Sequence, residues 1–417
     1  WEVEFFHLVE PARLKGAARH AFEEAGEIGV SMINYDGQRI DGYELIVDAL
    51  LGTGLNGPVA GIGAEAINAI NEASCPVIAA DIPSGLSADS GCVMGRAVQA
   101  DTTVSFIGLK QGLYTADGPD HCGRILFSDL NVPPEGYSHL TPSAHRIDYS
   151  SLSSMFAPRR SASHKGDFGH VLVVGGDSGM MGAARMAAEA AARMGAGLVS
   201  VATRAEHAAL ISGSRPELMC HGIETREALA PLLQRANVVA IGPGLGTREW
   251  GRAMLAAILE SHLPLVLDAD ALNLLAVEPL YHDKWVLTPH PGEAARLLGC
   301  TVAEIQQDRF GAVASLEASF GGVCVLKGSG TLVLGGDGET ALCSAGNPGM
   351  ASGGMGDVLT GVIAALIAQG MGLHQATRLG VVIHASAADR AAKQGGERGL
   401  LASDLFTHLR RLANPDK

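Results

Sequence analysis

The 417-residue sequence has no cluster of lysine and arginine, and its formal net charge is −14. A nucleic acid partner requires a basic face for its phosphates, so we expect no nucleic acid to bind. Charged residues are also scarce, at 18%, while hydrophobic residues make up 47%. This balance is typical of buried strands covered by helices and argues against a disordered chain.

The chain contains no apolar run of the ~18–20 residues that a membrane-spanning helix needs. The best candidate, residues 358–368, is shorter and is soon followed by Gly370. The seven cysteines include no Cys-x-x-Cys pair, which favours reduced thiols. We therefore expect a soluble, cytoplasmic protein with no membrane partner.

A chain of 417 residues exceeds the ~100–200 residues of one domain, so we expect two domains. Short β-branched runs alternate with helical patterns in both halves, which predicts parallel sheets covered by helices on both faces. Residues 131–160 break this pattern and predict a linker. The expected fold is α/β, with two doubly wound domains at residues 1–140 and 151–417.

The pattern also predicts where the elements lie. In the first domain we expect strands at residues 3–9, 44–51, 77–80, 103–107 and 124–127, and helices at 11–25 and 63–72. In the second domain we expect a helix at 182–194 and strands at 170–174, 198–202, 238–241, 265–267, 285–287, 323–326 and 331–334.

The stretch Asn347-Pro-Gly-Met-Ala-Ser-Gly-Gly-Met-Gly-Asp357 places a glycine-rich turn and one carboxylate before an apolar helical run. Gly353, Gly354 and Gly356 allow backbone angles closed to other residues, so successive N–H groups and the helix N-terminus can point at an anion. A carboxylate repels phosphate, so Asp357 is best explained as a base for an attacking hydroxyl. A glycine turn followed by an Asp N-cap is the structural alternative.

No GxxxxGK[ST] motif occurs, which excludes a P-loop.

Two further motifs follow expected strands, at the edge where open α/β sheets bind ligands. Gly242-Pro-Gly-Leu-Gly246 lets a ligand approach the main chain, or forms only a tight corner. Asp268 and Asp270 can line a site or lie near a metal, although Asp270 can also simply cap the next helix.

Two more motifs follow later strands. Thr288-Pro-His-Pro-Gly-Glu293 holds His290 rigidly, which favours ligand contact over a purely structural histidine. Lys327-Gly-Ser-Gly-Thr331 offers a cation and a hydroxyl to phosphates or ribose, or is a plain hairpin turn.

In the first domain, Gly52-Thr-Gly-Leu-Asn-Gly57 matches GxGxxG, and Asp81 follows about where a ribose-binding acid lies in the dehydrogenase fingerprint. The match is loose, because Pro58 changes how the next helix begins. Asp81-Ile-Pro-Ser-Gly85 combines a carboxylate, a rigid turn and a hydroxyl, which favours a ligand site over a ribose contact.

Together, the second-domain motifs closely resemble the ADP-dependent NAD(P)H-hydrate dehydratase family over residues 151–417. These motifs are His164-Lys-Gly, Gly242-Pro-Gly-Leu-Gly, Thr288-Pro-His-Pro-Gly-Glu, Lys327-Gly-Ser-Gly-Thr and the stretch from Asn347 to Asp357. The first domain, with Val47-Asp-Ala-Leu-Leu-Gly-Thr-Gly and Asp81-Ile-Pro-Ser-Gly, resembles the NAD(P)H-hydrate epimerase domain that bacteria fuse in front of it. The resemblance implies a ribokinase-like second domain and a Rossmann-like first domain.

The resemblance also implies a repair function. The substrates would be NADHX and NADPHX, the hydrated forms of NADH and NADPH. The epimerase would interconvert R and S hydrates, and the dehydratase would restore the S form. ADP (or ATP) would donate a phosphoryl group to the ring hydroxyl, and phosphate would then be eliminated. Mg²⁺ is expected with the nucleotide.

For the second domain, the resemblance implies that Asp357 is the catalytic base. The implied nucleotide contacts are Lys327, Gly328, Ser329, Gly330, Thr331 and Gly356. The implied hydrate contacts are Ala183, Gly244, Gly246, His290 and Asp357.

For the first domain, the resemblance implies that Asp81 binds the hydrate and acts in catalysis. Asp48 and Ser84 would bind K⁺. The implied substrate loop is Gly52, Thr53, Gly54, Leu55, Asn56 and Gly57. The family's Asn-Asn-Gly-Gly-Asp loop, which supplies phosphate contacts and a potassium ligand, is absent from residues 1–150. The resemblance places it just before Trp1, which implies a chain truncated there.

Other hypotheses stay open at this point. The glycine turn with its Asp is shared across the ribokinase-like fold, so the second domain can instead be a small-molecule kinase. The first domain can be a non-catalytic nucleotide-binding or docking module. The helix faces at 182–197 are rich in Ala and Gly and permit close subunit packing, so we expect a homo-oligomer, although they equally suit helix-on-sheet packing.

Overall fold

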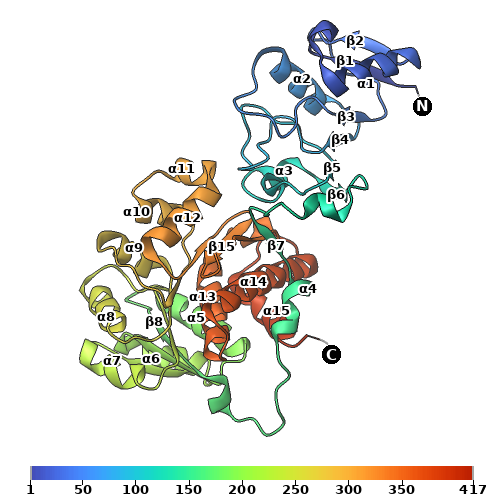
Figure 1. Ribbon diagram of the computed structural model, residues 1–417. Helices are drawn as coiled ribbons and strands as arrows, with labels where there is room; N and C mark the ends of the chain where they lie inside the picture. Colours follow the sequence, from blue (N-terminus) through green and yellow to red (C-terminus); the bar gives the residue numbers. More distant parts are fainter. Residues whose placement is uncertain (1, 416–417) are drawn as a thin grey trace. The chain divides into compact units, whose positions relative to one another are not determined.

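The computed structural model describes residues 2–415, which form two compact units that divide between Thr141 and Pro142 (Figure 1). Both units are α/β, as the sequence predicts. None of the helices in residues 2–415 combines the length and hydrophobicity that a membrane span requires.

The first unit contains two parallel sheets. The smaller pairs β1 (Glu4–His7) with β2 (Ser31–Asn34). The larger runs in the order β3 (Ile46–Asp48), β4 (Val77–Ala80), β5 (Thr102–Phe106) and β6 (Arg124–Ser128). The helices are α1 (Gly16–Glu27), α2 (Gly61–Glu72) and α3 (Gly118–His121), with short 3₁₀ turns at Pro11–Arg13, Gln111–Tyr114 and Pro134–Tyr137.

Most elements expected in this unit are confirmed, and several differ from the expectation. The helix expected at residues 11–25 begins only at Gly16, whose φ of 55° separates it from the 3₁₀ turn Pro11–Arg13. β3 is shorter than expected, and the Val47 side chain is 61% exposed, so the strand is not buried on both faces. The short strand β2 has little apolar sequence and was not expected.

The second unit is built on one ten-stranded sheet in the order β10-β9-β8-β11-β12-β13-β14-β15-β16-β7. Its strands are β7 (His145–Ile147), β8 (His170–Val174), β9 (Leu198–Thr203), β10 (Met219–Gly222), β11 (Val238–Ile241), β12 (Leu265–Leu267), β13 (Trp285–Leu287), β14 (Val323–Leu326), β15 (Thr331–Gly335) and β16 (Ala341–Cys343). The strands from β10 to β14 in this order are parallel, and β15 is antiparallel to both of its neighbours. The chain winds outward from β8 through β9 to β10 and then returns to the other side of β8, as expected of a doubly wound sheet.

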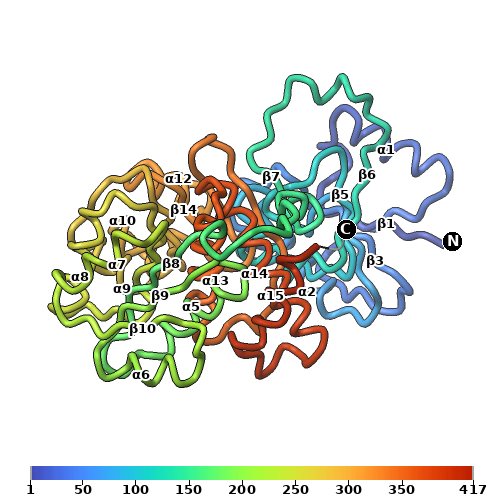
Figure 2. The backbone as a smooth tube through the Cα atoms, turned by 90° about the horizontal axis from the view of Figure 1, so that it is seen from below, coloured from blue at the N-terminus to red at the C-terminus, as the bar shows by residue number. Residues whose placement is uncertain are grey.

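The helices of this unit cover the sheet (Figures 1 and 2). They are α4 (Tyr149–Leu152), α5 (Met181–Arg193), α6 (Ala205–Ser214), α7 (Arg226–Leu233), α8 (Glu249–Leu259), α9 (Ala269–Val277), α10 (Pro291–Leu298), α11 (Val302–Gln307), α12 (Arg309–Phe320), α13 (Met355–Ala368), α14 (Leu373–Gly395) and α15 (Leu405–Leu412). Short 3₁₀ turns lie at Ser153–Met155, Lys165–Phe168, Pro348–Met350 and Ala402–Asp404. α13 packs against α5 and α14 inside the main hydrophobic core, which accounts for its long apolar sequence.

The prediction of a linker at residues 131–160 is partly wrong. β7 pairs in parallel with β16 and forms the edge of the large sheet, and Asp148 caps α4 by accepting a hydrogen bond from Ser151 N at 2.9 Å. Only Ile147 of β7 is buried, so the strand has almost no apolar signature in the sequence. The second unit therefore includes residues that precede 151.

The close contact between α13 and α5 gives a stability prediction. A Cβ atom on Gly361 would lie 2.0 Å from Ala187 O, so Gly361→Ala must push the two helices apart. We expect the substitution to lower the free energy of unfolding by ~1–3 kcal/mol. Gly395→Ala is the matched control, because Gly395 lies in α14 with nothing within 4 Å of an added Cβ. Urea denaturation of both variants checks this, and equal stability would contradict it.

Candidate active site

The loops that follow β8, β11, β12, β13 and β14 all lie at one edge of the large sheet, because these strands are parallel. The order in which the chain adds strands reverses between β8 and β11, since β9 and β10 lie on one side of β8 and β11 to β14 lie on the other. Open α/β sheets bind ligands beside such a reversal, outside the carboxyl ends of the strands. Most of the residues that the sequence analysis singled out in the second domain lie on these loops or in the first turn of the helices that follow them, whereas His164-Lys-Gly precedes β8 and lies at the other end of that strand.

The glycine-rich turn before α13 is fixed by hydrogen bonds from several sides. Asn347 Oδ1 accepts a bond from Gly349 N at 3.1 Å, and Asn347 Nδ2 donates to Asp389 of α14 at 2.9 Å. Ser352 Oγ donates to Leu400 O at 3.1 Å. The turn is therefore held in shape before any ligand binds.

The three glycines of this turn have different roles, which corrects the expectation that all three adopt unusual angles. Gly354 is the N-cap residue of α13, with a left-handed φ of 93°. Gly353 has no such angle, and a Cβ there would meet nothing within 4 Å. Gly356 lies inside α13, where a Cβ would come within 3.0 Å of Asp268 Oδ2 and 3.2 Å of Lys327 Nζ. Gly356 is needed for space above a buried ion pair.

Asp357 is the third residue of α13, so its carboxylate lies in the first turn of the helix and the expected N-cap position belongs to Gly354. Within residues 2–415 this carboxylate forms no hydrogen bond or ion pair. Burial, followed by the negative charge of Asp268, raises the pKa of Asp357 to about 7, although Lys327 opposes the shift. A carboxyl with this pKa can accept and release a proton near neutral pH.

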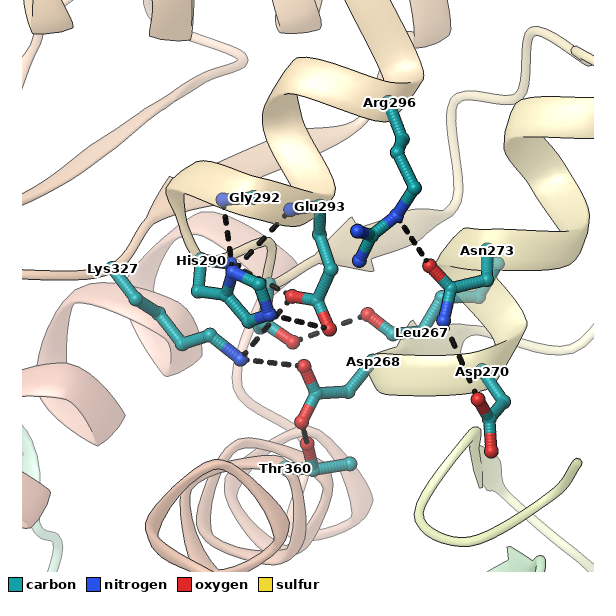
Figure 3. A network of polar contacts seen from close by, with 11 residues as sticks. Leu267, Asp268, Asp270, Asn273, His290, Gly292, Glu293, Arg296, Lys327 and Thr360 are labelled. Atoms are coloured by element: carbon teal, nitrogen blue, oxygen red, sulfur yellow. Dashed lines mark hydrogen bonds and ion pairs between the residues drawn. The ribbon is translucent and has the colours of Figure 1, made fainter. Parts of the chain in front are cut away.

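Beneath Gly356 lies a buried ionic network, drawn in Figure 3. Lys327 Nζ donates to Asp268 Oδ1 at 2.7 Å and lies 3.8 Å from Glu293 Oε2. Thr360 Oγ1, one turn after Asp357 on α13, donates to Asp268 Oδ2 at 3.0 Å. Burial alone would raise the pKa of Asp268, but the Lys327 charge together with hydrogen bonds from Lys327, Thr288 and Thr360 keeps the pKa below its usual value. The network joins the loops after β12, β13 and β14 to α13.

The segment from Lys327 to Gly330 is the turn of the β14–β15 hairpin, and Gly328 and Gly330 have φ values of 129° and 66°. Arg309 of α12 lies beneath the turn and is 1% exposed. Its Nη2 donates to Leu326 O at 3.3 Å and to Gly330 O at 3.2 Å. Because Arg309 holds these carbonyl groups on the inner side, the exposed outer side of the turn is available to a ligand.

Three of the expected hydrate contacts, Ala183, Gly244 and Gly246, lie beside the chain reversal. A Cβ on Gly244 would come within 3.2 Å of the Ala183 Cβ, so α5 and the loop after β11 are adjacent. Gly246 N donates to Asp270 Oδ2 at 2.9 Å. Asp270 therefore fixes the glycine loop, and the residue at the N-cap of α9 is Asp268.

His290 is the N-cap residue of α10. Its Nδ1 accepts hydrogen bonds from Gly292 N at 2.9 Å and Glu293 N at 3.3 Å, while His290 N donates to Glu293 Oε2 at 2.8 Å. The ring is 51% exposed, and Nε2 lies 3.4 Å from Glu293 Oε1. Burial lowers the pKa of His290, although Glu293 opposes the shift. The histidine thus has a structural role and also an exposed ring face.

In the first unit, Asp48 and Ser84 form a buried pair. Ser84 Oγ donates to Asp48 Oδ1 at 2.6 Å, and Ser84 N donates to Asp48 Oδ2 at 2.7 Å. Burial raises the pKa of Asp48, although the bonds from Ser84 oppose the shift. The carboxylate has no cationic partner within residues 2–415.

Asp81 follows β4 with a left-handed φ of 71°, which is rare for a residue with a side chain. Its Oδ1 accepts hydrogen bonds from Phe106 N at 3.0 Å and from Lys110 Nζ. Lys110 Nζ also donates to Phe106 O at 2.8 Å. No hydrogen bond reaches Asp81 Oδ2 within residues 2–415, so this atom can contact a ligand.

The loop at residues 52–57 follows β3 and is largely exposed. Gly52, Gly54 and Gly57 have ordinary φ values, and a Cβ on any of them would meet nothing within 4 Å. α2 begins only at Gly61. The loop therefore lacks the tight turn and close helix packing of the dehydrogenase fingerprint.

Sequence reasoning missed three residues that the structure connects to the candidate sites: Thr360, Arg309 and Lys110. Thr360 lies three positions after Asp357 on a helix, a spacing that could have indicated a shared face. Arg309 and Lys110 act through contacts with distant segments, and their local sequence carries no signal for this.

These features define the class of the second unit. It is a doubly wound α/β enzyme domain with an anion cradle at a helix N-terminus and a carboxyl beside it that titrates near neutral pH. Such an arrangement serves phosphoryl chemistry on an alcohol.

Comparisons with known proteins narrow this class to one family. Residues 171–411 match the family described as NAD(P)H-hydrate dehydratase, and residues 1–112 match the YjeF-related protein N-terminus. The bifunctional NAD(P)H-hydrate repair enzyme of Coxiella burnetii is 50% identical over 403 residues, 97% of this chain and 83% of that protein. The Escherichia coli enzyme of the same name is 46% identical over 400 residues, 96% of this chain and 76% of that protein.

Solved structures agree. The ADP/ATP-dependent NAD(P)H-hydrate dehydratase of Bacillus subtilis, co-crystallised with ATP and Mg²⁺, is 29% identical with a TM-score of 0.58 and covers 65% of this chain and 98% of its own. A ribokinase-like protein of Enterococcus faecalis has a TM-score of 0.60 at 29% identity, over 66% of this chain and 99% of its own. The chain belongs to the family of bifunctional NAD(P)H-hydrate repair enzymes, with an epimerase and a dehydratase domain.

The buried ion pair gives a second stability prediction. Lys327→Met leaves Asp268 as an uncompensated buried charge, and we expect a loss of ~3–5 kcal/mol in the free energy of unfolding. Asp268→Asn in the same chain removes that charge and should restore part of the loss. Lys284→Met is the control, because Lys284 is exposed. Urea denaturation followed by tryptophan fluorescence measures all three, since Trp250 and Trp285 are buried in this unit. Equal stability of Lys327→Met and Lys284→Met would contradict the prediction.

Proposed function

We propose that the second domain dehydrates the S hydrates of NADH and NADPH with ADP as phosphoryl donor, and that Asp357 is the base. The observation that carries the proposal is the position of this carboxyl. It lies at the N-terminus of α13 beside a glycine cradle, is free of hydrogen-bond partners within residues 2–415, and has a pKa of about 7. A carboxylate without a proton to take would only repel a phosphate there.

In the proposed first step, Asp357 takes the proton of the ring hydroxyl, and the hydroxyl oxygen forms a bond to the terminal phosphorus of ADP. The bond between that phosphorus and the bridging oxygen breaks, and AMP leaves. Phosphate then departs with the electrons of its C–O bond while the neighbouring ring carbon loses a proton, which restores the ring double bond. The backbone N–H groups around Gly354 and Gly356 stabilise the transferred phosphoryl group.

The proposed nucleotide contacts are the outer side of the turn from Lys327 to Thr331 and the cradle at Gly356. Lys327 is paired with Asp268, and in this proposal its positive charge offsets part of the repulsion between that carboxylate and the phosphates. No group of three or more His, Cys, Asp or Glu side chains within residues 2–415 is arranged to hold a metal. Mg²⁺ therefore fits best as an ion carried by the nucleotide's own phosphates, whose charge it neutralises.

The proposed hydrate contacts are Ala183, Gly244, Gly246 and His290 together with Asp357. The first three lie beside the chain reversal, where backbone can approach a ligand closely because side chains are small or absent. The exposed ring of His290 adds a polar contact, and Glu293 orients that ring.

For the first domain we propose that Asp81 interconverts the R and S hydrates, with the exposed loop at residues 52–57 beside the substrate. We also propose that Asp48 and Ser84 bind K⁺. Both offer oxygen ligands, and the buried Asp48 carboxylate has no cationic partner within residues 2–415, so a cation would compensate its charge. A cytoplasmic location and a homo-oligomeric state stay predictions.

The base assignment predicts a specific kinetic result. Asp357→Asn should lower kcat for S-hydrate dehydration by roughly 10²–10⁴-fold, the usual contribution of a general base. In the wild type, activity should fall as the pH drops through about 7, because protonation of Asp357 removes the base. NADH absorbance measures recovery of the cofactor. Asp283→Asn is the matched control, because its carboxylate is 79% exposed.

The reaction products test the same proposal independently. AMP and free phosphate should form in equal amounts with NADH. A phosphorylated hydrate that accumulates without elimination would indicate a ribokinase-like kinase instead and would overturn the proposed dehydratase step.

The first-domain proposal predicts a difference between two substrates in one chain. Asp81→Asn should abolish enzyme-dependent recovery of NADH from the R hydrate, while recovery from the S hydrate keeps the wild-type rate. Asp357→Asn should impair both. Equal rates on the R hydrate for the wild type and Asp81→Asn would contradict a catalytic role of Asp81.

A further inference from the structure

The second unit contains a basic groove that is separate from the candidate active site. It consists of two cavities of ≈1020 Å³ and ≈810 Å³ that share Arg193 and Arg410 among their lining residues. We call it the arginine groove and define it by Arg159, Arg193, Arg390, Arg410 and Arg411. Many residues that line the larger cavity lie on α4, α14 and α15. No residue proposed for the active site lines either cavity.

The composition of the groove is unusual for this chain. The formal net charge of the chain is −14, yet none of the described residues that line the two cavities is acidic. Several arginines of this unit outside the groove do have carboxylate partners, such as Arg226 with Glu260 at 2.6 Å. Arg390, Arg410 and Arg411 form no ion pair with any carboxylate of residues 2–415, and the nearest to Arg193 is Glu189 at 4.0 Å.

Crowding of unpaired positive charges raises the free energy of the protein unless an anion binds among them. A neighbouring histidine is consistent with such a field. Burial, followed by the charges of Arg411 and Arg390, lowers the pKa of His408 on α15. Guanidinium groups bind phosphates through paired, charge-assisted hydrogen bonds, which makes phosphate the anion that best fits several arginines around one cavity.

The walls also offer aromatic surface. Tyr149 lines the larger cavity, where its hydroxyl donates to Leu412 O at 2.6 Å and Arg390 lies 5.8 Å from its ring centroid. Phe156 lines the smaller cavity. Pockets for small ligands commonly enclose about 300–1,000 Å³, so each cavity has the size of a ligand site.

We propose that the arginine groove is a second anion site, which binds a polyphosphate-bearing small molecule such as a nucleotide. The shared cations Arg193 and Arg410 would hold the phosphates, and Tyr149 and Phe156 would contact a base. The site is remote from the chemistry. Arg193 ends α5 ten residues after Ala183, which corresponds to about 15 Å along the helix. The proposal goes beyond the repair reaction and does not depend on it.

Binding of inorganic tripolyphosphate to the full chain tests this proposal. Isothermal titration gives the number of equivalents bound by the wild type and by the groove variant, Arg390→Gln/Arg410→Gln/Arg411→Gln. The control variant, Arg226→Gln/Arg248→Gln/Arg252→Gln, removes the same charge from exposed positions elsewhere. We expect the groove variant to bind one equivalent fewer than the wild type and the control variant to bind as many. The affinity of the lost equivalent in the wild type should fall with added salt.

Two further measurements keep the result decisive. Arg410→Glu changes a single exposed residue and should weaken the same equivalent by roughly tenfold or more. An unchanged turnover of the S hydrate by the groove variant would show that the fold is intact. Equal stoichiometry in wild type and groove variant overturns the proposal. So does a change in sedimentation mass of the groove variant without loss of an equivalent, because it would assign the arginines to contact between copies of the chain.

Discussion

The buried ion pair between Lys327 and Asp268 is the interaction on which the catalytic edge depends. It lies where the loops after β12 and β14 meet α13, and Thr360 attaches the helix to it. Its two charges set the environment of Asp357 in opposite directions, one raising the pKa of that carboxyl and the other lowering it. The pair also explains why glycine suits position 356, since a Cβ there would lie 3.0 Å from Asp268 Oδ2 and 3.2 Å from Lys327 Nζ. The same ion pair therefore influences both the position of α13 and the pKa of Asp357.

Each domain contains a buried carboxylate, and the two carboxylates have different partners. In the second, a buried lysine compensates the carboxylate beneath the cradle. In the first, the buried Asp48 carboxylate accepts hydrogen bonds from the neutral donors of Ser84 and from Leu50 N, while Lys110 contacts Asp81. Because an uncompensated buried carboxylate is costly, the proposed K⁺ would compensate the charge of Asp48.

Much of this architecture could be predicted from the sequence. Strand and helix alternation gave the parallel sheets, and the glycine, proline and acidic motifs marked the loops at the carboxyl ends of the strands. The ionic network could not be predicted, because Lys327 and Asp268 are 59 positions apart and Asp268 and Thr360 are 92 apart. No local pattern encodes such contacts. For the same reason Arg309 was missed, as its role comes from carbonyl groups of another hairpin. Only Gly354 of the three glycines in the turn has a left-handed φ, and the sequence alone does not distinguish a glycine required for its φ angle from one required for space.

The edge strand β7 has a consequence for how the two activities can be separated. It lies upstream of the point where the sequence motifs of the second domain begin, yet it covers β16, whose backbone would otherwise face solvent. A dehydratase expressed alone from residue 151 would expose that row of unpaired N–H and C=O groups and would tend to associate through it. Division of the chain at Pro142 leaves β7 paired with β16, so the seam between the two units lies ahead of the first recognisable motif of the second domain.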